Sequence, residues 1–197
     1  MSGFIDIHTH NFTGRHSELH AVGIHPWDAE KVDVSELCDE QFAAADAIGE
    51  IGLDFACKVD KAKQEELFCE QLAIAQRLDK PVVLHCVRAF EPVVNLLSRY
   101  SIKTAIFHGF IGSSRQAEEA LKRGYFLSFG HRTLISAKTV EALRITPLSR
   151  LFVETDESGL DIEQMYGEIA HLRGVSVEEL IAATHENWNN IFKKANE

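Results

Sequence analysis

Short apolar runs that end in metal-competent side chains recur along this chain of 197 residues, and they constrain its fold more than any other feature. Each run has the length and the Val, Ile, Leu or Phe content of a buried β-strand. The carboxyl ends of parallel strands meet on one face of a sheet or barrel, so we expect these distant residues to cluster. The runs are FIDIHTH, AIGEIGLD, PVVLHC, TAIFHGF and RLFVETD, and their metal-competent residues are His8, His10, Glu50, His85, His108 and Asp156.

Strands alternate with helices along the sequence, a pattern that predicts right-handed crossovers and a parallel sheet. Strands are expected at residues 3–8, 19–24, 46–52, 81–85, 103–108, 125–129 and 150–154. Helices are expected at residues 35–44, 61–79, 89–100, 114–123, 137–143, 162–172 and 186–195, and a further helix is expected to begin after Ser176. Ser113 and Ser114 are candidate N-caps of the helix at 114–123, and Ser176 opens a capping box. Seven strands are one fewer than a (β/α)8 barrel needs, and such barrels usually have about 250 residues. We therefore expect one α/β domain over residues 1–197, TIM-barrel-like but shortened, with an incomplete or distorted barrel.

Composition limits the cellular environment and the binding partners that we expect for this protein. The net charge of −10 argues against a broad basic surface for nucleic acids. No apolar stretch approaches the ~18 residues of a membrane span, so no membrane partner is expected. The first strand begins near Phe4 and leaves no room for a signal peptide, and the four cysteines lack C-x-x-C spacing, which favours reduced thiols. We therefore expect a cytoplasmic protein, and the sequence favours no oligomeric state.

Taken one at a time, the six residues have simpler explanations. A histidine at the end of an apolar strand is more often a hydrogen-bonded core residue than a ligand, and Asp156 could cap the next helix. Glu50 is harder to explain, because an unpaired buried carboxylate costs several kcal/mol and its run contains no Lys or Arg. A single metal site formed by all six residues explains them together. Four imidazoles and two carboxylates suit two divalent ions, which we expect to be zinc, manganese or another first-row metal, with magnesium bound more weakly.

The motifs together resemble the TatD family of metal-dependent hydrolases, which is related to the amidohydrolase-type barrels. The matching stretches, in family order, are DIHTH, GIHPWD, IGEIGLD, PVVLHC, FHGFIGS, LSFG and ETD. They run from Phe4 to Asp156, with a weaker match at residues 187–192. The resemblance implies a distorted TIM barrel in which His8, His10 and Asp156 bind one metal. It also implies that His85 and His108 bind the other and that Glu50 bridges the two.

The activity that the resemblance implies is that of a metal-dependent nuclease or phosphoesterase. A metal-activated water would attack the phosphodiester, with Glu50 and Asp156 as the catalytic carboxylates and Asp156 as the base that takes the proton. We expect a small phosphoester or a nucleic-acid end as substrate, contacted by His25, Arg88 and Arg132. The simpler alternatives are a fixed turn histidine before Pro26 for His25 and plain surface charge for the two arginines.

Two other functions remain open, because a fold does not determine a reaction. The same metals would serve hydrolysis of a small C–N or ester substrate. Alternatively, the protein binds metal but has lost turnover. The displaced arginine supports this last alternative, since Val87 stands where the family usually has Arg and Arg88 comes one residue later. Glu157-Ser158 also replaces the Ser-Pro or Ala-Pro of the family pattern.

The chain also lacks one β/α unit between His10 and Gly23, where only a short polar loop remains. We expect either that the strands flanking this deletion pair directly or that residues 11–18, or a second subunit, cover an open edge.

Overall fold

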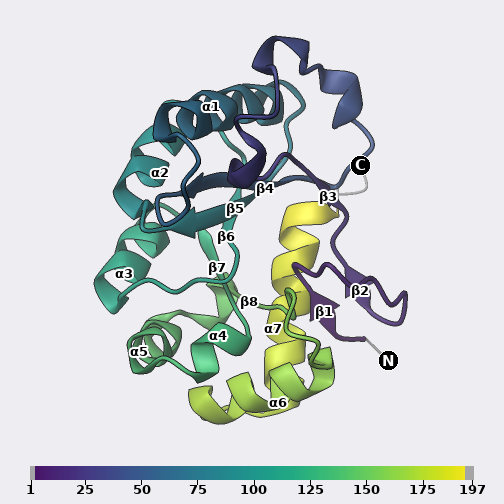
Figure 1. Cartoon of the computed structure of the whole chain (residues 1–197). Coiled ribbons are helices and arrows are strands. Elements are labelled where there is room, and N and C mark those ends of the chain that lie inside the picture. Colours follow the sequence, from purple (N-terminus) through teal and green to yellow (C-terminus); the bar gives the residue numbers. More distant parts are fainter. Residues whose placement is uncertain (1–2, 194–197) are drawn as a thin grey trace. The chain divides into compact units, whose positions relative to one another are not determined.

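The computed structural model describes residues 3–193 and divides the chain into two compact units. The first unit comprises Met1–Leu19 and His108–Glu197, and the second comprises His20–Phe107 (Figure 1). Each is described by itself. Within the described residues, no helix is both long enough and apolar enough to cross a membrane.

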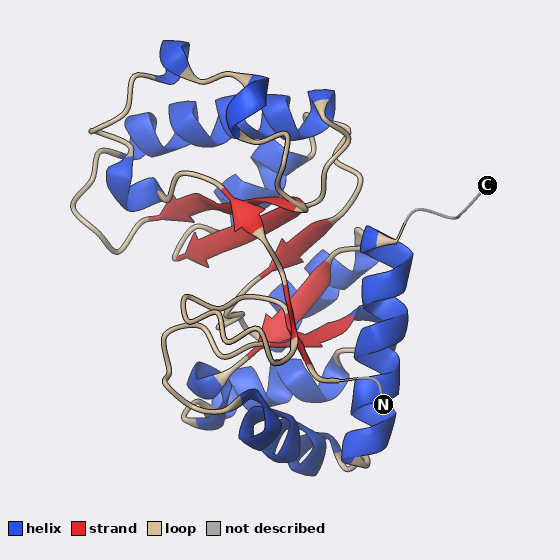
Figure 2. Cartoon of the chain, turned by 90° about the vertical axis from the view of Figure 1, so that its right-hand side faces the viewer, coloured by secondary structure: helices blue, strands red, loops and turns tan. Residues whose placement is uncertain are grey.

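The second unit is a parallel sheet with helices packed against it. Its strands are β3 (Ala21–Val22), β4 (Ala47–Asp54), β5 (Val82–Val87) and β6 (Ala105–Phe107), paired in that order. Its helices are α1 (Lys61–Arg77) and α2 (Phe90–Leu97), and both contact β4. In Figure 2 the blue helices of this unit lie along one side of its red strands. The near-continuous apolar sequence of β4 and β5 is typical of parallel strands that are buried on both faces.

Close backbone contact between β4 and β5 explains a glycine in this sheet. Gly52 has a φ of 139°, and it pairs with His85 of the neighbouring strand. A Cβ atom at position 52 would overlap the backbone carbonyl oxygen of His85. The contact brings the strand that carries Glu50 against the strand that carries His85.

We expect Gly52→Ala to lower the free energy of unfolding by at least about 3 kcal/mol, because the added methyl group overlaps backbone that cannot move aside. The matched control is Gly124→Ala. Gly124 also has positive φ, at 81°, but no heavy atom beyond its two chain neighbours lies within 4 Å of the point where an added Cβ would stand. Only backbone strain of about 1 kcal/mol should appear there. Urea denaturation of both variants measures the difference, and equal losses would contradict this explanation of Gly52.

The first unit joins the start of the chain to its second half. Its strands are β1 (Ile5–Asp6), β2 (Ser17–Glu18), β7 (Phe126–Phe129) and β8 (Leu151–Val153), with β1 parallel to β2 and β7 parallel to β8. Its helices are α3 (Ser114–Lys122), α4 (His131–Leu134), α5 (Ala137–Ile145), α6 (Ile162–Arg173) and α7 (Val177–Phe192). The buried hydroxyl group of Tyr166 on α6 donates to the carbonyl oxygen of Ile5 at 3.0 Å. This bond helps to fix β1, whose end carries the first two histidines.

The segment after β1 also lies against the segment after β8. The backbone N–H of Ile7 donates to the carbonyl oxygen of Val153 at 3.2 Å, and that of Asp156 donates to His8 at 3.0 Å. Residues that are distant in sequence are therefore hydrogen-bonded neighbours where the candidate ligands begin.

The predicted alternation of parallel strands and helices is confirmed within both units. The two capping predictions are also confirmed. Ser113 and Ser176 each accept a hydrogen bond from the backbone three residues later, at Gln116 and Glu179, in reciprocal capping boxes.

Three corrections apply to the predicted elements. Residues 35–44 were expected to form a helix, but they contain only the 3-10 turns Val34–Glu36 and Asp39–Gln41. The carboxylate of Asp33 accepts the backbone N–H of Ser35, and Cys38 is extended, so local polar bonds replace a helix. The separate helices expected after Ser176 and at 186–195 are one helix, α7, and residues 194–195 lie outside the described residues.

The third correction concerns the strand expected at residues 19–24. Only Ala21–Val22 of that range form a strand, β3, which pairs with β4. A further strand, β2, forms at Ser17–Glu18 in the polar loop and pairs with β1, so the described residues contain eight strands where seven were expected. Ile5 pairs with Ser17 and Asp6 with Glu18, so the end of the polar segment 11–18, and not the strand expected at 19–24, lies along β1. The Glu18 carboxylate accepts hydrogen bonds from the backbone N–H groups of Thr13 and Gly14, and these bonds close the short loop between β1 and β2.

Candidate functional site

The first unit brings His8, His10 and Asp156 together at the ends of β1 and β8. The Nε2 atoms of His8 and His10 lie 3.8 Å and 3.5 Å from Asp156 Oδ1. One ligand atom from each residue lies within 4.8 Å of the others. Two imidazole nitrogens and one carboxylate oxygen form a donor set that suits zinc and other first-row divalent metals.

Asp156 has an unusual backbone that directs its side chain. Its φ of 51° lies in the left-handed region, which costs a non-glycine residue of order 1–3 kcal/mol and is tolerated best by Asp and Asn. The backbone on both sides holds it there: its N–H donates to His8, and its carbonyl oxygen accepts the N–H of His10 at 3.4 Å. The same hydrogen bonds that join the two chain segments therefore place the Asp156 carboxylate beside both histidines.

His108 lies in the same unit, beside a carboxylate that we did not single out from the sequence. Its ring centroid is 4.2 Å from that of His8, and its Nδ1 atom is 3.6 Å from Oε1 of Glu154. His108, Glu154 and Asp156 form a second group of converging ligand atoms. Burial tends to raise the pKa of the Glu154 carboxyl, but the nearby imidazoles of His108 and His8 leave it lowered. Glu154 thus stays ionised although it is only 1% exposed.

A pocket of about 250 Å³ opens beside these residues. It is lined by Glu154 and Asp156 from the end of β8 and by His131 and Arg132 from α4. The predicted substrate contact Arg132 is therefore exposed next to the candidate metal ligand Asp156.

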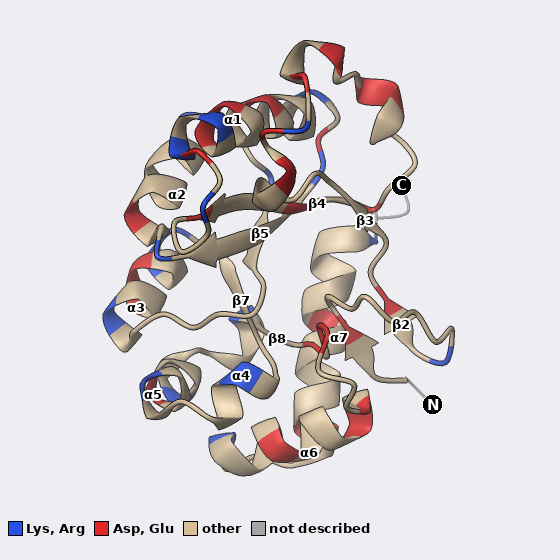
Figure 3. Cartoon of the chain, in the orientation of Figure 1, with Lys and Arg blue, Asp and Glu red and all other residues tan. Residues whose placement is uncertain are grey.

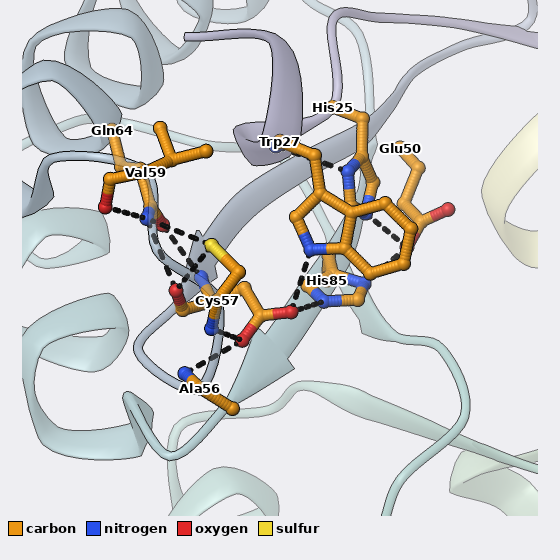
Figure 4. A network of polar contacts seen from close by, with 9 residues as sticks. His25, Trp27, Glu50, Ala56, Cys57, Val59, Gln64 and His85 are labelled. Atoms are coloured by element: carbon orange, nitrogen blue, oxygen red, sulfur yellow. Dashed lines mark hydrogen bonds and ion pairs between the residues drawn. The ribbon is translucent and has the colours of Figure 1, made fainter.

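The second unit has a cluster of its own, built from β4, β5 and the turn after β3. Glu50 Oε1 forms an ion pair with His85 Nδ1 and lies 3.5 Å from His25 Nε2 (Figure 4). Ligand atoms of these three residues also lie within 4.8 Å of one another. The structure thus brings two of the predicted metal ligands together with one predicted substrate contact.

The hydrogen bonds of His25 favour a donor role over metal binding. Its Nδ1 atom accepts the backbone N–H of Trp27 at 3.2 Å, so the proton of the neutral ring is on Nε2. That N–H faces the Glu50 carboxylate. The turn therefore holds the His25 ring, its other nitrogen is directed toward Glu50, and its role as a substrate contact stays a prediction.

Asp54, at the end of β4, is the second residue that our sequence analysis did not single out. Its Oδ2 atom accepts the indole N–H of Trp27 at 2.7 Å and lies 3.3 Å from His85 Nε2. Burial tends to raise the pKa of this carboxyl, but the hydrogen bonds from Trp27 and Ala56 leave it lowered. The signal in the sequence is a carboxylate that ends a strand of buried apolar residues, and it is the same signal that identified Glu50.

Arg88 differs from the other predicted contacts. It follows β5 in the second unit, it is exposed, and its φ is 53°. It is not among the residues that line the pocket beside Asp156.

Comparison with known proteins relates the chain to one family. The model of the family described as TatD related DNase matches residues 8–193 of the chain. The human protein named Deoxyribonuclease TATDN3 is 32% identical over 164 residues, which are 75% of this chain and 60% of that protein. The protein named Uncharacterized metal-dependent hydrolase YjjV, from Escherichia coli strain K12, is 34% identical over 195 residues, which are 87% of this chain and 75% of that protein.

A solved structure supports the same relationship. The crystal structure of YJJV, a TatD homolog from Escherichia coli K12, matches with a TM-score of 0.79 and 27% sequence identity, over 91% of this chain and 78% of that one. This likeness confirms the expected α/β, TIM-barrel-like fold. The chain spans 60% of the length of the human relative, so it is shorter than the protein it matches there. Because the family model covers almost all of the described residues, the chain belongs to the TatD related DNase family.

Proposed function

We propose that this protein is a metal-dependent hydrolase that cleaves phosphodiester bonds, as a deoxyribonuclease does. The observation that carries the proposal is the convergence of His8, His10 and Asp156 at two strand ends beside a pocket that contains Arg132. These three residues would hold one divalent ion. The assignment of His85, His108 and Glu50 to a second ion, which the family resemblance implies, stays a prediction.

In this reaction the cluster of His8, His10 and Asp156 would hold a divalent ion, and Arg132 would contact the phosphate. A bound divalent cation would polarise the phosphoryl oxygen and lower the pKa of a water molecule. The Asp156 carboxylate would accept the proton of the attacking water. The Arg132 guanidinium, exposed in the same pocket, would donate to the phosphate oxygens and neutralise part of their charge.

The volume of the pocket and the net charge of the protein favour a small phosphoester, or the end of a nucleic acid, as the substrate. A pocket of about 250 Å³ admits one phosphodiester group and its neighbours, not a duplex. The net charge is −10, and in Figure 3 Lys and Arg lie among Asp and Glu along α1. Affinity for nucleic acid would therefore come from the metals and a few arginines, with few phosphates neutralised.

A substrate comparison tests the proposal. We expect the protein loaded with Mn²⁺ to hydrolyse bis-p-nitrophenyl phosphate and to shorten single-stranded DNA. EDTA should stop both reactions, and added Mn²⁺ should restore them. Hydrolysis of small amides or carboxylic esters alone would contradict the proposal and favour a C–N or ester substrate. Stoichiometric metal with no turnover on any of them would indicate a metal-binding protein without activity.

A further inference from the structure

We propose that the exposed indole ring of Trp27 is a stacking platform for the base of a nucleotide whose phosphate is held at the cluster of Glu50 and His85. The inference rests on the proposed function for the class of ligand, because a nucleotide carries an aromatic base together with its phosphate. The contacts that support it all lie within the second unit.

Trp27 is a large aromatic residue on the surface of this unit. It is 56% exposed, whereas Pro26 before it is buried. Single exposed apolar side chains are common on protein surfaces and need no ligand to explain them. Trp27 differs from such a side chain because both its backbone and the polar end of its ring are held by hydrogen bonds.

A short turn fixes the backbone of Trp27. The turn is the 3-10 helix Pro26–Asp28, and His25 caps it by accepting the backbone N–H of Trp27 at 3.2 Å. The indole N–H of Trp27 donates to Oδ2 of Asp54 at 2.7 Å. The ring is therefore tied at its polar edge although more than half of the residue is open to solvent.

The carboxylate that holds the indole ring is itself fixed. Oδ1 of Asp54 accepts the backbone N–H groups of Ala56 at 2.8 Å and Cys57 at 3.2 Å. The fully buried side chain of Gln64 accepts the backbone N–H of Asp54 at 2.8 Å and donates to its carbonyl oxygen at 3.0 Å (Figure 4). A ring that is oriented in advance loses little conformational entropy when a ligand stacks on it.

The indole ring lies beside candidate metal ligands. Its centroid is 4.6 Å from that of His25 and 6.2 Å from that of His85, with interplanar angles of 79° and 70° (Figure 4). Neither imidazole is therefore stacked parallel to the indole. Ligand atoms of His25, Glu50 and His85 lie within 4.8 Å of one another, a cluster that suits a divalent ion and a phosphate bound to it. Because a single sugar separates the base of a nucleotide from its phosphate, a phosphate held there places the base within reach of Trp27.

Stacking of this kind recognises the presence of a base more than its identity, since every base has a π-face. We expect a nucleotide to bind about 5–100-fold more tightly than the same sugar phosphate without its base. The probes are 2′-deoxyadenosine 5′-monophosphate (dAMP) and 2-deoxyribose 5-phosphate. They differ only in the base, and neither contains a phosphodiester bond.

Tryptophan fluorescence is the first readout, because the chain contains only two tryptophans. The other, Trp188 on α7 in the first unit, packs against the ring of Phe192 at 4.6 Å. In the Zn²⁺-loaded variant Trp188→Phe all tryptophan emission comes from Trp27. We expect dAMP to quench this emission with saturation, at concentrations where 2-deoxyribose 5-phosphate has no effect.

Three results of this titration would overturn the proposal. One is the absence of quenching, and another is a linear quenching equal to that of free N-acetyltryptophanamide. The third is emission that changes with protein concentration but not with dAMP, which would show that a second copy of the chain covers the ring.

Calorimetric titration of two Trp27 variants is the second readout. Trp27→Leu and Trp27→Phe both lose the bond to Asp54, so only the aromatic face distinguishes them. We expect Trp27→Leu to bind dAMP about 5–100-fold more weakly than the wild type, and Trp27→Phe to bind it at least about 3-fold more tightly than Trp27→Leu. Equal affinities of the two variants for dAMP, or an equal loss of affinity for 2-deoxyribose 5-phosphate, would contradict stacking. If Trp27→Leu does not fold, the quenching of Trp27 alone decides.

Neither readout measures hydrolysis, so the two hypotheses fail separately. A protein that binds dAMP at Trp27 but cleaves no phosphodiester would refute the proposed function and leave this inference standing. A phosphodiesterase whose Trp27 emission does not respond to dAMP would refute the inference alone.

Discussion

Replacing Asp156 with asparagine is expected to lower kcat/KM for phosphodiester hydrolysis by about 10²–10⁴-fold. The change removes a negative charge from the point where the Nε2 atoms of His8 and His10 converge, and it removes the base that accepts the proton of the attacking water. The measurement is the initial rate on bis-p-nitrophenyl phosphate at saturating Mn²⁺. Thermal unfolding of the variant separates a chemical effect from loss of the fold.

Two arginine variants serve as controls for this prediction. Arg132→Ala should lower the rate less than Asp156→Asn, because the guanidinium would bind the phosphate without activating the water. Arg88→Ala should have a smaller effect still, since Arg88 is exposed and does not line the pocket beside Asp156. Equal and small effects of Asp156→Asn and Arg88→Ala would refute the role given to Asp156.

Replacing Glu50 with glutamine is expected to weaken metal binding by at least about 100-fold, because a charged ligand oxygen is exchanged for a neutral amide beside His85 and His25. If Glu50 is shared between two ions, as the family pattern predicts, the occupancy of both should fall. Glu118→Gln, an exposed carboxylate on α3, is the control that removes the same charge elsewhere. The measurement is elemental analysis after dialysis against a fixed free metal concentration. Full occupancy in Glu50→Gln would contradict its role as a ligand.

Elements with strong local signals could be predicted from the sequence. The apolar runs at β4 and β5 correctly predicted two buried strands of a parallel sheet. Ser113 and Ser176 correctly predicted where two helices begin, and both form capping boxes in the structure. Residues 35–44 could not be predicted well, because their polar side chains make local bonds that compete with a helix. The strand expected at 19–24 is shortened to Ala21–Val22, and Ser17–Glu18 of the preceding loop forms a strand instead, because the pairing with β4 and with β1 decides which residues are extended and local sequence does not encode it.

The candidate site, too, could be predicted from the sequence only where the signal is local. The side chains of His8 and His10 could be related to one another by their spacing, since residues i and i+2 of a strand point the same way. The roles of Asp54 and Glu154 could not be predicted, because their partners are Trp27, 27 residues away, and His108, on another strand end. The bond from Trp27 N–H to His25 is local, but the approach of His25 to Glu50 depends on the packing of β4 beside the turn after β3.

The metal content of the wild-type protein tests the central claim most directly. The protein should be purified without chelators, resupplied with Mn²⁺ or Zn²⁺, freed of excess metal and analysed for its elements. We predict that divalent metal stays bound in stoichiometric amounts, held by imidazole and carboxylate ligands such as His8, His10 and Asp156. A folded protein that retains no metal after this treatment would contradict the account.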